Sequence, residues 1–177
     1  MSHNRITSIP DYFGQMKTLE VFNISFNRLT SLSKTLTCLS VLTKLIVSHN
    51  KINKIDKEFS KIRTLLTLDA SYNNLTNLPI ELCELEQLET LDLRYNNLQC
   101  LPSDIRRMIG LKSMNTFTDL FQRFGLHLLG NSITDPPSYI WKSTNIQTLF
   151  NYFEDKEKDL LNSFHCLKLI FIGPKNI

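Results

Sequence analysis

The side chains that could hold a metal ion or attack a substrate are scattered along this chain. Its four histidines lie tens of residues apart, and none has a carboxylate or cysteine at metal-ligand spacing. The cysteines form no CxxC pair and no terminal cluster: they are Cys38, Cys83, Cys100 and Cys166. We therefore expect reduced, mostly buried thiols. Since GxSxG and HExxH motifs are also absent, the sequence indicates no catalytic residue, no metal site and no cofactor.

A glycine near the C-terminus, Gly173, could open a phosphate-wrapping turn, and Lys175 follows it two residues later. A buried parallel strand is predicted by the apolar residues Leu167, Leu169, Ile170, Phe171 and Ile172, and Gly173 follows them directly. This strand followed by GPKNI is similar to the opening of a P-loop, G-x-x-x-x-G-K-[ST], cut one residue before its second glycine. Because the motif's Gly-Lys-Ser/Thr end is missing, Gly173 and Lys175 should not bind nucleotide by themselves.

The composition narrows the class of protein. The 177 residues are 42% hydrophobic and 21% charged, which is typical of one globular domain. A net charge of +3 is too small to give the uniform basic face that nucleic-acid binding usually requires. No apolar run reaches the roughly 18 residues of a membrane span, and no hydrophobic signal core follows the first residues. We expect a cytoplasmic protein without a membrane span or a nucleic-acid partner.

An asparagine that recurs every 23 residues organises most of the chain. The asparagines are Asn4, Asn27, Asn50, Asn73 and Asn96, and an isoleucine or leucine lies two residues after each. Apolar residues also recur before each asparagine, which completes the pattern LxxLxLxxNxL. Each repeat is then a short strand, a turn and a return segment, and only stacking buries its apolar side. The period predicts a solenoid whose strands form one parallel sheet.

Each part of the repeat has a structural role. All five repeat asparagines, Asn4, Asn27, Asn50, Asn73 and Asn96, are predicted to form a buried ladder, since buried amides in a repeat normally satisfy backbone groups. In the return half, apolar pairs such as Phe59 with Ile62 have the i, i+3 spacing of a helical or 3₁₀ turn. Proline fixes φ at the start of this segment in three repeats, as Pro10, Pro79 and Pro102.

These repeats resemble the intracellular leucine-rich repeats of the 23-residue type, as found in Ras-binding scaffold proteins and in Roco proteins. The resemblance covers roughly residues 2–153 and implies an α/β horseshoe with a parallel concave sheet and short helical or 3₁₀ convex segments. It implies a protein-interaction module, the partner-binding or regulatory arm of a larger intracellular signalling protein, without naming the partner.

The order of the segments, repeats followed by a helix and a P-loop opening, is also similar to that of Roco proteins, whose repeats precede a Ras-like GTPase domain. This second resemblance implies GTP, magnesium and a GTPase or kinase activity only for a longer parent chain.

The chain is expected to divide into three segments. Residues 1–153 contain five regular repeats and an irregular sixth, residues 154–165 a capping helix or linker, and residues 166–177 the first strand of the truncated P-loop domain. The pattern breaks after the fifth repeat, because Asn131 lies 35 residues after Asn96. Residues 115–125 are expected to loop out, either as a functional protrusion or as a plain loop. Because the first block begins in mid-repeat, we also expect further repeats upstream.

Alternation along the strands directs the residues between the leucines outward, onto the concave face. The predicted partner-binding residues are Asn23, Lys44, Ile46, Thr67, Asp69, Thr90, Asp92 and Arg94. A column of rings precedes the asparagines and comprises His3, Phe26, His49, Tyr72 and Tyr95. We interpret it as stacking between repeats, with partner contact as the alternative. The oligomeric state stays open.

Overall fold

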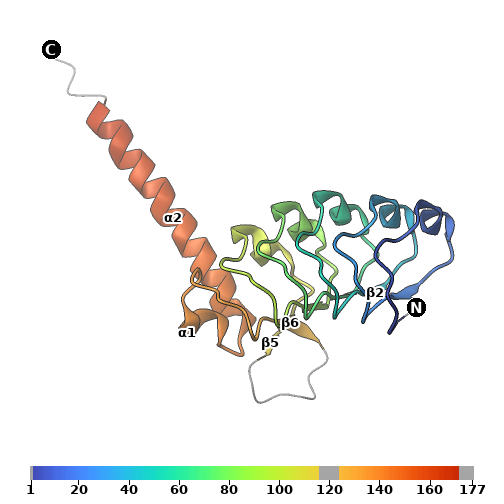
Figure 1. Ribbon diagram of the computed structural model, residues 1–177. Helices are drawn as coiled ribbons and strands as arrows, with labels where there is room; N and C mark the ends of the chain where they lie inside the picture. The colour runs from blue at the N-terminus through green and yellow to red at the C-terminus, as the bar shows by residue number, and fades with distance from the viewer. Residues whose placement is uncertain (1, 116–123, 172–177) are drawn as a thin grey trace, which may run out of the picture.

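The computed structural model describes residues 2–115 and 124–171 and confirms the expected solenoid. The chain winds through successive coils, with strands along one side and 3₁₀ helices along the other (Figure 1). The described strands form one parallel sheet in the order β1-β2-β3-β4-β6-β5. The strands are β1 Val21–Asn23, β2 Lys44–Ile46, β3 Thr67–Asp69, β4 Thr90–Asp92, β5 Met114–Asn115 and β6 Gly125–His127.

The return segments are short helices on the opposite side from the sheet. The 3₁₀ helices are η1 Asp11–Gln15, η2 Lys34–Cys38, η3 Lys57–Lys61, η4 Ile80–Glu84 and η5 Ser103–Arg107. Pro10, Pro79 and Pro102 stand at the N-caps of η1, η4 and η5, as the sequence predicts. In the two repeats without proline, the side chains of Ser33 and Asp56 accept hydrogen bonds from backbone N–H groups of the first turn.

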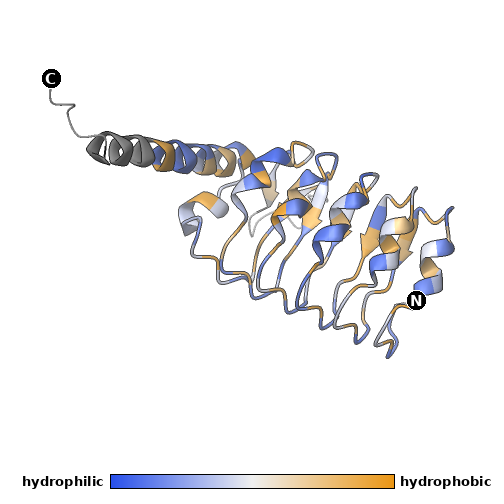
Figure 2. Cartoon of the chain, turned by 90° about the horizontal axis from the view of Figure 1, so that it is seen from above, coloured by the Kyte–Doolittle hydropathy of each residue, from blue (hydrophilic) through white to orange (hydrophobic). Residues whose placement is uncertain are grey.

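The core is one continuous apolar column inside the coils. The middle residue of each strand points inward, so that Leu45, Leu68 and Leu91 are stacked in register and no more than 1% exposed. Figure 2 shows hydrophobic and hydrophilic residues alternating along the coils, the pattern that stacking of identical coils requires.

The buried asparagines form the expected ladder. Asn50 accepts a hydrogen bond from Leu29 N–H at 2.9 Å, and its Nδ2 donates to carbonyls of its own coil and of the preceding one, Ile24 O, at 3.1 Å. Asn27, Asn73 and Asn96 accept equivalent bonds from the preceding coil and are buried too. Asn131 continues the ladder by accepting from Leu98 N–H. The prediction is wrong for Asn4, which is exposed, because no coil precedes it in the described chain to pack against it.

The interruption after the fifth repeat is arranged differently from the expectation. Chain order alone would put β5 next to β4, but β6 occupies that place and β5 lies beyond it, at the edge of the sheet. The ladder explains this order, because Asn131 Nδ2 donates to Leu93 O of the β4 coil at 2.8 Å and so brings its own strand against β4. The expected loop 115–125 therefore begins and ends in strands, and residues 116–123 lie outside the described residues.

A helix ends the solenoid and replaces the expected C-terminal strand. A short helix, α1 Ser138–Trp141, precedes α2 Ile146–Phe171, which projects away from the last coil in Figure 1. Residues 154–165 lie within α2, and residues 166–171 are helical, so the strand predicted there is wrong. A continuous apolar run does not distinguish strand from helix, and no glycine or proline interrupts the chain between Pro137 and Gly173. Gly173 and Lys175 lie outside the described residues.

The first turns of α2 cover the open end of the last coil. Ile146, Leu149 and Phe153 are buried against the core. Asp135 accepts a hydrogen bond from Tyr152 Oη at 2.8 Å and pairs with Lys156 Nζ at 2.6 Å. These contacts give the solenoid the polar cap that a terminal repeat needs.

Candidate functional site

The concave face is open over β1 to β3. Among the predicted contact residues, Asn23 and Lys44 are exposed, while Ile46, Thr67 and Asp69 are partly exposed. Val21, at the start of β1, is 54% exposed and belongs to the same face. The register aligns Val21 with Lys44 and Thr67, and Asn23 with Ile46 and Asp69, so these side chains form two adjacent rows across the sheet.

The same face is closed over β4. Thr90 and Asp92 are each only 7% exposed, which contradicts their predicted role as contact residues. Asp92 binds the guanidinium of Arg94 through both carboxylate oxygens, with Arg94 Nη2 2.6 Å from Oδ2. This pairing raises the pKa of Arg94, and it leaves Arg94 as the partly exposed member of the pair.

Polar residues at the ends of the strands also have a structural task. Asp69 Oδ1 accepts hydrogen bonds from Ser71 N at 3.0 Å and from Ser71 Oγ at 2.6 Å. Asn23 Oδ1 accepts the same two bonds from Ser25. These side chains satisfy backbone donors where each strand ends, and both serines are buried. Asn23 and Asp69 thus offer a partner only the part of each side chain that faces away from the turn.

One residue of this face was missed by the sequence analysis. His127 pairs in register with Asp92 and is 6% exposed. Burial lowers the pKa of His127, and the negative charges of Asp92 and Asp69 oppose that effect only in part. The signal was present in the sequence, because the 35-residue step that places Asn131 after Asn96 also places His127 after Asp92.

The ring column is a stack that runs along the solenoid. Neighbouring ring centroids from His3 to Tyr95 lie 4.2, 4.0, 4.1 and 4.3 Å apart, with the rings within 20° of parallel. This confirms the interpretation as stacking between repeats. All five residues have positive φ, between 51° and 60°, which costs roughly 1–2 kcal/mol each and is offset in part by stacking, at roughly 0.5–1.5 kcal/mol per pair. The five ring residues therefore form the turn with their backbone and stabilise it with their stacked side chains.

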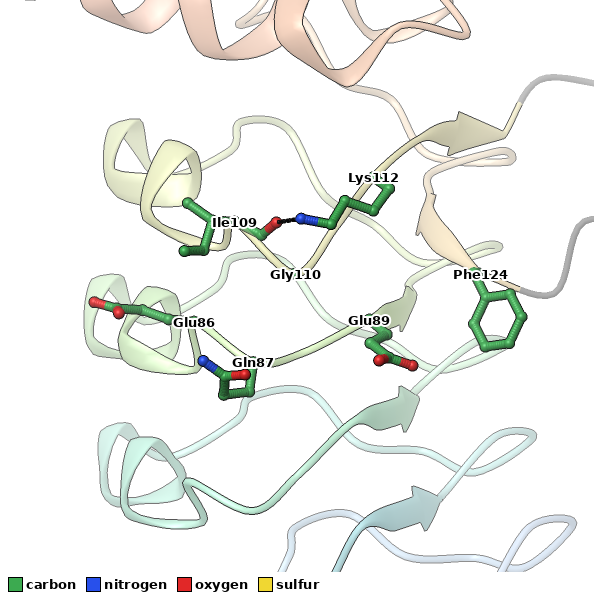
Figure 3. A pocket seen from close by; sticks show the side chains of 7 residues that line it. All are labelled: Glu86, Gln87, Glu89, Ile109, Gly110, Lys112 and Phe124. Carbon is green, nitrogen blue, oxygen red and sulfur yellow. Dashed lines mark hydrogen bonds between the residues drawn. The ribbon is translucent and has the colours of Figure 1, made fainter.

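A hollow of about 510 Å³ lies on the flank where the chain enters β4 and β5 (Figure 3). Its lining consists of Glu86, Gln87, Glu89, Ile109, Gly110, Lys112 and Phe124. Gly110 is required here, since a Cβ would lie 2.5 Å from Leu88 O. Ile109 and Phe124 are 58% and 61% exposed. These residues include no nucleophile next to a base, so the hollow is suited to contact and not to catalysis.

The His, Cys, Asp and Glu side chains of the described residues form no metal site. No group of three or more His, Cys, Asp or Glu side chains there could hold a metal ion. Cys38 and Cys100 are exposed, which corrects the expectation of mostly buried thiols, because both lie at solvent-facing positions of their coils. Cys83 is buried, and burial raises its pKa to about 12. Among residues 2–115 and 124–171, no helix is long and apolar enough to cross a membrane.

Comparison with known proteins agrees with this architecture. The leucine rich repeat family matches residues 1–52 and 40–98. A leucine-rich-repeat protein of Leptospira interrogans is 30% identical with a TM-score of 0.66 and is matched over 75% of this chain and 37% of its own. An internalin of Listeria monocytogenes is 26% identical with a TM-score of 0.61, over 79% and 37% of the two chains.

The ectodomain of the plant membrane receptor kinase GASSHO1/SCHENGEN3 from Arabidopsis thaliana is also similar, in a complex with CASPARIAN STRIP INTEGRITY FACTOR 2. It is 27% identical, with a TM-score of 0.56, over 72% of this chain and 17% of its own. The chain thus spans well under half the length of these structures. No curated protein matches the sequence. Because the family match, the 23-residue register and the parallel sheet agree, the chain belongs to the leucine-rich-repeat family.

Proposed function

We propose that this chain is a protein-binding module that holds its partner on the concave face of β1 to β3. The observation that carries the proposal is the open pair of rows formed by Val21, Lys44 and Thr67 and by their neighbours. These side chains project from strands fixed by ladder hydrogen bonds, so little conformational entropy opposes contact. The leucine-rich-repeat fold supports a non-enzymatic binding role.

We also propose that this module acts inside cells, as the partner-binding or regulatory arm of a larger signalling protein. The 23-residue repeat pattern, similar to that of intracellular scaffolds, supports the proposal. A second proposal is that the chain is part of a Roco-type GTPase. Its support is limited to Gly173 and Lys175 near the end of the sequence, because residues 166–171 are helical and do not form the strand that would precede a P-loop. A transcript that continues from Ile177 with Gly-Lys-Ser or Gly-Lys-Thr would support it, and one without that triplet would exclude it.

The binding proposal is tested with two matched double variants. The concave variant combines Val21→Arg with Lys44→Glu, and the control combines Tyr12→Arg with Lys57→Glu on the 3₁₀ side. Both double changes alter the net charge equally and replace exposed side chains. A partner recovered with the wild-type chain should bind the concave variant at least about tenfold more weakly, as loss of one or two central contacts implies, and the control unchanged. The reverse pattern would refute the assignment of the surface.

A further inference from the structure

The flank on which the chain leaves the strands exposes three parallel columns of side chains. We define this turn flank as residues 3–8, 26–31, 49–54, 72–77 and 95–100. In one coil Phe26, Arg28 and Thr30 are exposed and belong to the first, second and third column, while Asn27 and Leu29 between them are buried. The second column contains Arg5, Arg28, Lys51, Asn74 and Asn97, and all five are exposed.

The backbone fixes the spacing of this second column. Arg28 N donates to Ile6 O, and Lys51 N donates to Leu29 O, each at 2.8 Å. Successive coils are therefore one strand spacing apart, about 4.8 Å. Arg5, Arg28 and Lys51 therefore lie side by side on three consecutive coils.

No acidic side chain in the described part of the chain pairs with these three cations. The turn flank contains no Asp or Glu. Within residues 2–115 and 124–171, the ion pairs involve other basic residues: Lys34, Lys61, Arg63, Arg94, Arg106, Arg107, Lys156 and Lys158. A row of unpaired like charges repels itself and attracts an anionic partner.

The stacked rings beside the cations favour the same sign of charge. Each inner ring has both faces covered by its neighbours at 4.0–4.3 Å, so the solvent meets ring edges. Ring edges carry the positive part of the aromatic quadrupole. Because their faces are covered, the inner rings can neither stack nucleobases nor bind a partner's lysine by a cation–π contact.

We propose that the turn flank docks an extended acidic segment of a partner protein, whose carboxylates pair with Arg5, Arg28 and Lys51. Side chains on one face of an extended segment recur about every 6.6 Å, so three carboxylates span about 13 Å against about 10 Å for the three cations. The long Arg and Lys side chains bridge this difference. Hydroxyls and amides of the third column, at Thr7, Thr30 and Asn53, lie beside the cations to bind the polar groups of the segment.

The test measures binding of a labelled twelve-residue peptide that alternates Glu and Ser, by fluorescence anisotropy at low and physiological salt. The flank variant combines Arg5→Gln, Arg28→Gln and Lys51→Gln. Its control combines Lys57→Gln, Arg63→Gln and Arg107→Gln, which are exposed cations of the helical side with the same total charge. Circular dichroism verifies that both variants remain folded.

The flank variant should bind the peptide about tenfold more weakly, as three exposed ion pairs imply, and salt should weaken wild-type binding. The control should stay within about twofold. The concave variant Val21→Arg with Lys44→Glu should also retain the peptide, which keeps this proposal separate from the concave one. Equal loss in the flank variant and control, loss in the concave variant, no wild-type binding, or tighter binding of a Lys-Ser peptide or a single-stranded oligonucleotide would overturn the proposal.

Discussion

Removing one rung of the asparagine ladder should destabilise the solenoid far more than the same change one residue away. Asn73 accepts a hydrogen bond from Ile52 N–H at 2.9 Å and donates to three backbone carbonyls at 3.0–3.1 Å. After Asn73→Ala the carbonyls keep other donors, because Asn50 and Asn96 Nδ2 and His49 N still reach them. The buried N–H of Ile52 loses the acceptor that it has in the structure.

The magnitude follows from this count. One orphaned buried N–H costs roughly 1–3 kcal/mol, and weakening three shared bonds adds to it, so we expect a loss of about 2–4 kcal/mol. With a urea m-value of roughly 1–3 kcal/mol/M, the unfolding midpoint should fall by about 1–2 M. The control is Asn74→Ala, which makes the same chemical change at an exposed position of the same coil.

Urea titrations followed by far-ultraviolet circular dichroism measure both midpoints under identical conditions. Equal midpoints for the two variants would refute the reasoning that the asparagines hold the coils together. A lower midpoint for Asn73→Ala with an unchanged m-value would support it, since the native and unfolded states would then expose the same surface as in the wild type.

Three further outcomes follow from burial and backbone geometry. Iodoacetamide at pH 8 should label Cys38 and Cys100 but leave Cys83 unmodified until urea is added, because burial raises the pKa of Cys83 to about 12; peptide mass spectrometry reads each site. Burial lowers the pKa of His127 in the folded protein below its ordinary value of 6.5, so the folded state is favoured while His127 is neutral and loses stability as the pH falls below 6.5. Unfolding midpoints at pH 7.5 and 5.5 should therefore differ less in His127→Gln than in the wild type. Gly130→Ala places a Cβ 2.5 Å from a neighbouring ring carbon at φ +76° and should lower stability by roughly 1–3 kcal/mol, and an unchanged urea midpoint would contradict this.

The periodic part of the fold could be predicted because one physical requirement repeats. Each coil must bury its leucines and satisfy its turn, so the spacing of Asn27, Asn50 and Asn73 fixes the register of the sheet. Where the period is broken, this constraint is lost. β6 and not β5 lies next to β4 because β6 brings Asn131 into the ladder. Which of the two strands takes that place depends on tertiary contacts, and the local sequence does not indicate them.

The concave surface could be predicted in direction but not in exposure. Alternation along a strand tells which side chains leave the core, and Lys44 and Thr67 do so. Thr90 and Asp92 follow the same alternation and are nevertheless buried, because exposure depends on what else packs over the sheet. The continuation of α2 through residues 166–171 was missed for a different reason, since a largely apolar stretch has the same hydrophobic pattern in a helix and in a buried strand.

The most direct test of the binding account uses a photo-crosslinking amino acid at two similarly exposed positions of the first repeat. Val21 on β1 is 54% exposed on the concave side, and Tyr12 on η1 is 59% exposed on the opposite side. Irradiation in the presence of a partner purified on the wild-type chain should give a covalent adduct from position 21 and none from position 12. Adducts from position 12 alone would contradict binding through the concave face.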